Sequence, residues 1–182
     1  MYKYFKRSAD FLFSLILLIF LWWLIVLLII LATIDTKTFG FFIQKRIGQY
    51  KKPFNIYKIK TYQKNHSISN FGVILRQSKL DELPQLLNVF WGTMSFVGPR
   101  PDVPGFADVL KGHDSSILSV KPGITGPASI VFRNEEQLLK QQKDPDRYNK
   151  ETVWPKKVEL NVKYVEELSF KKDIYYLVKT IF

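Results

Sequence analysis

The chain has 182 residues, enough for one modest domain with a hydrophobic core and one attached segment. It contains no cysteine and only two histidines, which excludes disulfide frameworks, thiolate zinc sites and cysteine nucleophiles and disfavours a histidine-rich metal site. The 27 basic and 16 acidic residues give a net charge of +11, typical of proteins that face nucleic acid, anionic lipid or a phosphorylated substrate.

An apolar segment at Phe11–Ala32 dominates the start of the chain. It has 22 uncharged residues, and Ser14 is its only polar side chain. As a helix it would be about 33 Å long, which matches a bilayer core of about 30 Å. It is longer than the apolar region of a signal peptide, and no small-residue cleavage site follows it. We therefore expect a membrane helix within residues 1–34 and a membrane-associated domain at 35–182.

The charges beside this segment leave two topologies open. Lysine and arginine mark the cytoplasmic side of a membrane, and here they occur on both flanks. A re-entrant helix with both ends in the cytoplasm fits these charges. A spanning helix fits the absence of proline and glycine, the usual causes of a sharp break.

The next part of the chain predicts a β-hairpin and a helix. Residues 39–47 and 53–61 are rich in aromatic and β-branched side chains and flank a polar GQYKK turn. Residues 62–70 are polar and predict a loop. Residues 78–91 have leucines and aromatic residues at helical spacing, which predicts one amphipathic helix.

The second half of the chain predicts loops and further helices. Residues 92–101 and 121–127 are dense in glycine and proline and indicate rigid loops. Residues 102–120 are partly helical in pattern, and 134–150 predict a helix with a break at its proline. Residues 155–182 predict one or two basic amphipathic helices, a pattern found both on membrane surfaces and on ordinary protein surfaces. The expected fold class is α+β and mainly helical.

An acidic pair marks the predicted helix at 78–91. Pro84 is tolerated only in the first turn of a helix, which places Asp81 and Glu82 at the N-terminus. Acidic residues at this position commonly act as simple helix caps. The same position also attracts phosphate, because free backbone N–H groups and the positive end of the helix dipole meet there.

Two arginines strengthen the interpretation of a phosphate site. Arg100 lies between two prolines in the GPRP loop, and Arg76 precedes the acidic pair. The guanidinium group suits phosphate, and carboxylates between basic residues suit metal-assisted phosphoryl transfer. The sequence contains neither standard glycine-rich nucleotide loop, no G-x-S-x-G and no H-E-x-x-H. Taken alone, the residues predict a membrane-attached protein that handles a phosphorylated ligand.

The order of the motifs resembles the bacterial sugar transferase family, the monotopic polyprenyl-phosphate phosphoglycosyl transferases. The resemblance covers nearly the whole chain, and its pieces are KRSADF, QKRIG with KPFNIYKIKT, LRQSKLDELPQLLNVFWGTMSFVGPRP, KPGITGPASIVFRN and VELNVKYVEELSFKKDIYYLVKTI. Many members carry a Ser-Pro pair that breaks the membrane helix, and Trp22-Trp23 occupies that place here.

The resemblance implies transfer of sugar-1-phosphate from a UDP-sugar to polyprenyl (undecaprenyl) phosphate at the cytoplasmic face of the bacterial inner membrane. It implies that Asp81 is a nucleophile forming a covalent phosphosugar intermediate, and that Glu82 assists it. Both carboxylates would serve a Mg²⁺ ion. We expect Arg76, Arg100 and Arg133 to bind phosphate or nucleotide, with Lys60 and Lys58 as weaker candidates. Membrane lipid is an expected partner, and nucleic acid is not.

A second class of function is a membrane-tethered basic module that binds anionic lipid or nucleic acid without turnover. Residues 33–182 carry +9 of the total charge, which this interpretation explains. It does not explain an acidic pair close to GPRP.

Overall fold

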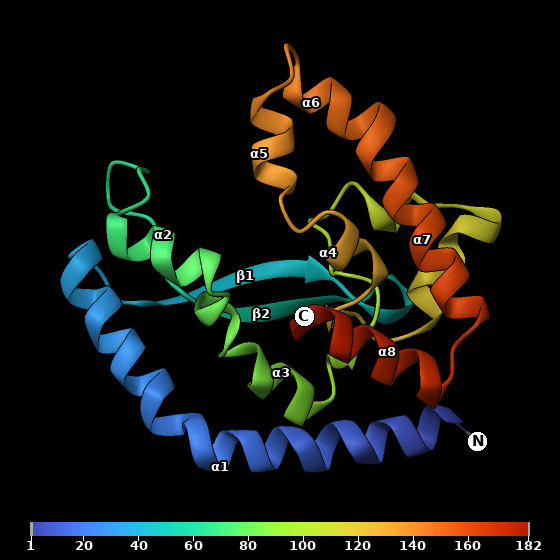
Figure 1. The fold of residues 1–182 in the computed structure, drawn as a ribbon, viewed down its shortest axis with the longest axis horizontal. Coiled ribbons are helices and arrows are strands. Elements are labelled where there is room, and N and C mark those ends of the chain that lie inside the picture. The colour runs from blue at the N-terminus through green and yellow to red at the C-terminus, as the bar shows by residue number, and fades with distance from the viewer. Residues whose placement is uncertain (1, 182) are drawn as a thin grey trace. The chain divides into compact units, whose positions relative to one another are not determined.

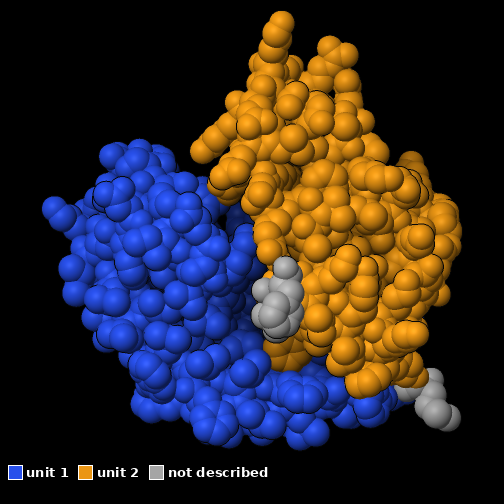
Figure 2. Space-filling view, viewed as in Figure 1, with its two compact units in different colours: residues 1, 3–46, 53–94 blue, residues 2, 47–52, 95–182 orange. Residues whose placement is uncertain are grey.

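The computed structural model describes residues 2–181 and separates them into two compact units (Figures 1 and 2). Unit 1 contains residues 3–46 and 53–94, and unit 2 contains residues 2, 47–52 and 95 onward. The mainly helical α+β class expected from the sequence is confirmed. The expected division after residue 34 stays a prediction, because these units reflect contacts within the chain and not contact with a membrane.

The first element is helix α1, Tyr2–Thr36. By length and composition it is apolar enough to cross a membrane. It contains no proline or glycine, yet Figure 1 shows that it changes direction along its length. Near both of its ends, α1 contacts other segments of unit 1.

The C-terminal part of α1 belongs to the core of unit 1. Leu28 and Ala32 pack with Ile59 and Leu75 in one buried cluster. Just after the helix, Gly40 lies so close to α1 that a Cβ atom there would come within 2.2 Å of a helix carbonyl oxygen. Only glycine permits this approach, which brings the following strand directly against the helix.

The predicted hairpin is confirmed. Strands β1 (Phe41–Ile47) and β2 (Pro53–Ile59) form a two-stranded antiparallel sheet, joined through a 3₁₀ turn at Gln49–Lys51. The rings of Phe41 and Tyr57 stack across the pair with centroids 5.6 Å apart. Cross-strand aromatic pairs of this kind help to fix strand register.

The single helix predicted at 78–91 is wrong in its bounds. The structure has helix α2 at Asn70–Gln77, a 3₁₀ turn at Leu80–Glu82, and helix α3 at Gln85–Trp91 (Figure 1). We call the 3₁₀ turn the acidic turn.

Two residues explain the interruption. Lys79 adopts a left-handed backbone conformation with φ of 59°, which turns the chain between α2 and the acidic turn. Pro84 has no N–H to donate, so α3 starts only after it. The apolar periodicity still has a packing role, because Leu80 and Leu83 contact the core cluster of unit 1.

Unit 2 contains a second small sheet that the sequence did not predict. Strand β3 (Ser95–Val97) pairs in parallel with β4 (Gly123–Thr125). Both lie in segments predicted as loops, which is a correction. Strands of three residues are too short to produce an alternating pattern, and here tertiary pairing outweighs the glycine and proline content.

Helices make up most of the rest of unit 2. They are α4 (Pro127–Val131), α5 (Glu135–Lys140), α6 (Pro145–Tyr148), α7 (Trp154–Glu166) and α8 (Phe170–Ile181), with 3₁₀ turns at Ala107–Val109 and Gly112–Ser119 and a π turn at Asn149–Val153. Val158 and Val162 of α7 pack against Ile117 and Leu118 to form the core of this unit. The helices predicted at 134–150 and 155–182 are confirmed, with α6 beginning at the proline expected to cause a break.

Candidate active site

Asp81 and Glu82 occupy the acidic turn between α2 and α3 in unit 1. Each residue is only 7% exposed. Buried carboxylates are uncommon unless they are paired or hydrogen-bonded, so this pair is unusual for a simple surface cap. The expectation that the acids lie at a helix N-terminus is corrected, because α3 begins three residues after Glu82.

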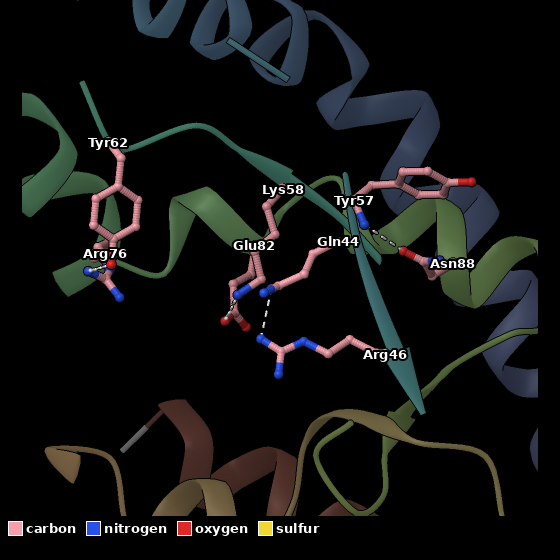
Figure 3. Close-up of polar contacts among 8 residues, drawn as sticks. All are labelled: Gln44, Arg46, Tyr57, Lys58, Tyr62, Arg76, Glu82 and Asn88. Atoms are coloured by element: carbon pink, nitrogen blue, oxygen red, sulfur yellow. Dashed lines mark hydrogen bonds and ion pairs between the residues drawn. The ribbon is translucent and has the colours of Figure 1, made fainter. Parts of the chain in front are cut away.

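Glu82 forms an ion pair with Lys58, which reaches it from strand β2. The Nζ atom of Lys58 donates to Oε1 of Glu82 at 3.1 Å (Figure 3). The side chains of Lys58 and Glu82 are 16% and 8% exposed, so water screens this pair less than an ordinary surface salt bridge. Lys58, a weaker candidate from sequence, is therefore in direct contact with the acidic pair.

The groups around Asp81 act on its pKa in opposite directions. Burial raises the pKa of the Asp81 carboxyl, and the neighbouring Glu82 carboxylate raises it further. Lys58, Lys79 and Arg76 each act to lower this pKa, in that order. The net effect is a raised pKa, so Asp81 ionises less readily than a solvated aspartate, and the three cations oppose this rise.

Arg76 lies in the last turn of α2 and is held by an aromatic ring. Its guanidinium carbon is 5.3 Å from the centroid of the Tyr62 ring, and its Nη1 donates to the Tyr62 hydroxyl at 3.1 Å (Figure 3). The electrostatic effect of Arg76 on Asp81 places it in range of the acidic pair. Lys60 donates its backbone N–H to the carbonyl oxygen of Gly40 at 2.8 Å, and its expected role toward phosphate stays a prediction.

The other two predicted arginines belong to unit 2. Arg100 lines a small cavity together with its flanking prolines Pro99 and Pro101. Arg133 donates from Nη2 to the carbonyl oxygen of Thr180 at 2.7 Å and thus caps the C-terminal end of α8. Their expected roles in binding phosphate or nucleotide stay predictions.

Sequence reasoning missed a second polar pair beside the acidic turn. Gln44 and Arg46 lie two residues apart on β1, so their side chains share one face of the hairpin. The Nη2 atom of Arg46 donates to Oε1 of Gln44 at 2.7 Å, and Figure 3 shows both side chains on the same side as Lys58 and Glu82. The alternation of polar residues in QKR was the available signal for this shared face.

The donors at this site fit a magnesium ion that is shared with a substrate. Two adjacent carboxylates are available, and Mg²⁺ is usually held by one or two carboxylates together with substrate phosphates. Among residues 2–181, no group of three or more acidic or histidine side chains is arranged to hold a metal ion by itself. The chemistry that these residues suit is attack on, or stabilisation of, a phosphate group among cations.

Comparison with known proteins identifies similar sequences. The family model described as "Bacterial sugar transferase" matches residues 1–182. The chain is 35% identical over 152 residues to the uncharacterized sugar transferase EpsL of Bacillus subtilis (strain 168). The aligned region covers 78% of this chain and 67% of EpsL.

Two further relatives have names that state a reaction. The UDP-N-acetylgalactosamine-undecaprenyl-phosphate N-acetylgalactosaminephosphotransferase of Aeromonas hydrophila is 26% identical over 99% of this chain and 43% of its own length. The UDP-glucose:undecaprenyl-phosphate glucose-1-phosphate transferase of Escherichia coli (strain K12) is 28% identical over 97% of this chain and 39% of its own length. The chain spans less than half the length of both relatives.

Proposed function

Because the chain belongs to the bacterial sugar transferase family, we propose that it transfers sugar-1-phosphate from a UDP-sugar to polyprenyl phosphate. The resemblance found in the sequence is thereby confirmed at the level of the family. The observation that carries the proposal is the buried acidic turn, in which Glu82 pairs with Lys58 and Asp81 lies among three cations. The names of the Aeromonas and Escherichia relatives supply the substrate classes.

In the proposed first step, a carboxylate oxygen of Asp81 attacks the phosphorus that carries the sugar. A bond forms between that oxygen and phosphorus, the bond from phosphorus to the bridging oxygen breaks, and UMP leaves. In the second step a phosphate oxygen of polyprenyl phosphate attacks the same phosphorus and releases Asp81. The product is a polyprenyl diphosphate sugar, and the carboxylate is regenerated.

Nearby cations make this attack feasible. A carboxylate and a diphosphate repel each other, so the negative charge must be offset for them to approach. Lys58, Lys79 and Arg76 are the cations that act on Asp81. A Mg²⁺ ion held by Asp81 and Glu82 would supply further charge neutralisation on the phosphate oxygens. In the proposal, Glu82 assists by holding this ion or a proton of the acceptor phosphate.

We further propose that both ends of α1 lie at the cytoplasmic face of the bacterial inner membrane. Near its N-terminus, Arg7 donates to the carbonyl oxygens of Val89 and Phe90 at 2.8 and 2.7 Å, and Phe11 stacks on Phe90. Near its C-terminus, Ala32 is buried in the core of unit 1. A helix anchored to one folded unit at both ends cannot place those ends on opposite sides of a bilayer, so these contacts favour re-entry.

Release of UMP tests the enzymatic proposal. The full chain in detergent is incubated with a panel of UDP-sugars, polyprenyl phosphate and Mg²⁺, and wild type is compared with Asp81→Asn. We expect UMP release from at least one UDP-sugar and a loss of at least about a thousandfold in Asp81→Asn, because an amide is not a competent nucleophile. A variant as active as wild type would refute the role given to Asp81.

The alternative is a membrane-tethered basic module without turnover. The net charge of +11 favours it, since basic surfaces bind anionic lipid and nucleic acid. Its signature would be salt-sensitive binding to DNA or anionic vesicles by a chain that releases no UMP from any UDP-sugar.

A further inference from the structure

Asn88 lies on α3, where its buried side chain bonds to the backbone of strand β2. Its Nδ2 donates to the carbonyl oxygen of Asn55 at 2.7 Å. Its Oδ1 accepts from the N–H of Tyr57 at 3.2 Å, a bond drawn in Figure 3. The residue is only 1% exposed. Both ends of the amide therefore bond to β2, and Nδ2 also donates to Oγ1 of Thr93 at 3.2 Å. The orientation of the amide is fixed, because only its oxygen can accept from Tyr57.

These two bonds take the place of the hydrogen bonds that a further strand would make with β2. β2 pairs with β1 along one edge, and residues two apart on a strand present their backbone groups to the same edge. Asn55 and Tyr57 are two apart, so Asn88 satisfies a donor and an acceptor on the edge of β2 that faces α3. The Tyr57 ring also meets Trp91 of α3 edge-on, with centroids 5.7 Å apart.

The position of this contact relates it to the acidic turn. Lys58 directly follows Tyr57, and Asn88 follows Glu82 by six residues on the segment that runs into α3. The same two segments therefore meet twice: at the Lys58–Glu82 ion pair, and at the contact of Asn88 with the strand. The contact of Asn88 with β2 limits how far the strand can move against α3. It thereby limits where the Lys58 side chain can lie.

We propose that Asn88 is a positioning residue that holds β2 against α3 so that Lys58 meets Glu82 beside Asp81. The proposal rests on the transferase function given above. It predicts that Asn88 acts on turnover through Lys58 and not through the general stability of the fold.

A double-mutant cycle tests this. UMP release by the full chain is measured for Asn88→Ala, Lys58→Met and the double variant, well below the melting temperature of each. We expect Asn88→Ala to lower kcat about 10- to 100-fold, a range known for residues that orient a ligand of the reacting centre. Its KM for the UDP-sugar should change in the same direction as in Lys58→Met. The double variant should be no slower than Lys58→Met. Losses that multiply in the double variant would overturn the proposal.

Two further variants distinguish a loss of fold stability from a loss of the positioning of Lys58. Val89→Ala weakens the packing of a fully buried side chain on the same helix and should lower the melting temperature without lowering kcat. Equal loss of kcat in Val89→Ala and Asn88→Ala would also overturn the proposal. If Asn88→Ala does not fold, the near-isosteric Asn88→Asp takes its place in the cycle, because it keeps the acceptor for Tyr57 but cannot donate to Asn55.

The outcomes separate this inference from the function on which it rests. If Asp81→Asn is inactive while Asn88→Ala and Asn88→Asp turn over like wild type, the positioning role is wrong and the transferase proposal stands. If Asp81→Asn is as active as wild type, the proposed chemistry itself fails.

Discussion

The charge on Asp81 is set by a small number of identified neighbours. Burial and Glu82 raise its pKa, while Lys58, Lys79 and Arg76 lower it. In the proposed reaction Asp81 acts as a deprotonated nucleophile, so we expect activity to rise as the pH passes upward through the pKa of Asp81. Removing one of the cations raises the pKa of Asp81, which moves the rise in activity to higher pH. Removing the charge of Glu82 lowers this pKa, which moves the rise in activity to lower pH.

We therefore expect Lys79→Gln to shift the acidic limb of the kcat/KM profile to higher pH. Glu82→Gln should shift the limb of its residual activity to lower pH. The measurement is UMP release across a pH series at constant ionic strength. Lys64→Gln, which removes an exposed lysine that does not act on Asp81, is the control and should leave the limb in place. A limb unchanged by both Lys79→Gln and Glu82→Gln would contradict the role of Asp81.

Lys58→Met should lower both turnover and stability. It leaves the Glu82 carboxylate buried without its lysine, and breaking a buried pair on one side costs about 3 kcal/mol. Urea unfolding measures this loss. The double change Lys58→Met with Glu82→Gln should recover part of the stability but not the activity, whereas Lys45→Met, on the exposed part of β1, should change neither.

At the scale of elements, the C-terminal end of α3 is held by a residue of α1 and closed by a glycine. Arg7 bonds to the carbonyl oxygens of Val89 and Phe90, and Gly92 closes the helix in a left-handed conformation. The last carbonyls of a helix have no partners within it, so a guanidinium fork is well placed to satisfy two of them.

Arg7→Lys should loosen this end of α3, because an ammonium group cannot bond to both carbonyls in the same planar geometry. We expect a loss of about 1–2 kcal/mol in the protection of α3 amides against hydrogen exchange. Lys3→Gln, on an exposed residue near the same end of α1, is the matched control. Equal protection in wild type and Arg7→Lys would show that these bonds do not stabilise the helix.

Helix α8 presents an apolar stripe between lysines. Phe170, Ile174 and Val178 are each between 43% and 54% exposed and follow one another at four-residue spacing. Exposed apolar side chains flanked by basic ones are typical of helices that lie on anionic membranes. Hydrogen exchange of the full chain should show α8 more protected in anionic than in zwitterionic nanodiscs, and Lys171→Gln with Lys179→Gln should reduce that difference.

The sequence predicted the elements whose signals are local. The uncharged run before residue 33 and the aromatic-rich strands around GQYKK each carry their own pattern, and both appear in the structure. The acidic turn was not predictable, because it depends on a left-handed Lys79 for which side-chain type gives no warning. β3 and β4 were missed because each is defined by its partner and not by its own residues.

The candidate site was predictable only in part. Asp81 and Glu82 were visible from their spacing to Pro84 and from the family resemblance. The contact with Lys58 and the edge contact of Asn88 both depend on how β2 lies against the segment 82–88, which no local pattern specifies. Long-range pairing of this kind is what single-sequence reasoning cannot supply.

At the scale of the whole molecule, the proposed re-entrant topology of α1 rests on its contacts with unit 1 near both ends. Because the chain contains no cysteine, single cysteines can be introduced without background. Lys3→Cys and Lys37→Cys should both be protected from an impermeant thiol reagent in intact spheroplasts and should both react after lysis. Labelling of only one of them in intact cells would show a spanning helix.

The hydrogen bonds from Arg7 to α3 also bear on how the protein is inserted into the membrane during synthesis. Val89 is synthesised 82 residues after Arg7, so the apolar helix leaves the ribosome and meets the lipid long before its carbonyl partners exist. An N-terminus that had already been exported would be out of reach when α3 finally folds. In the proposed topology, insertion of α1 must therefore leave the first residues of the chain on the side where translation takes place.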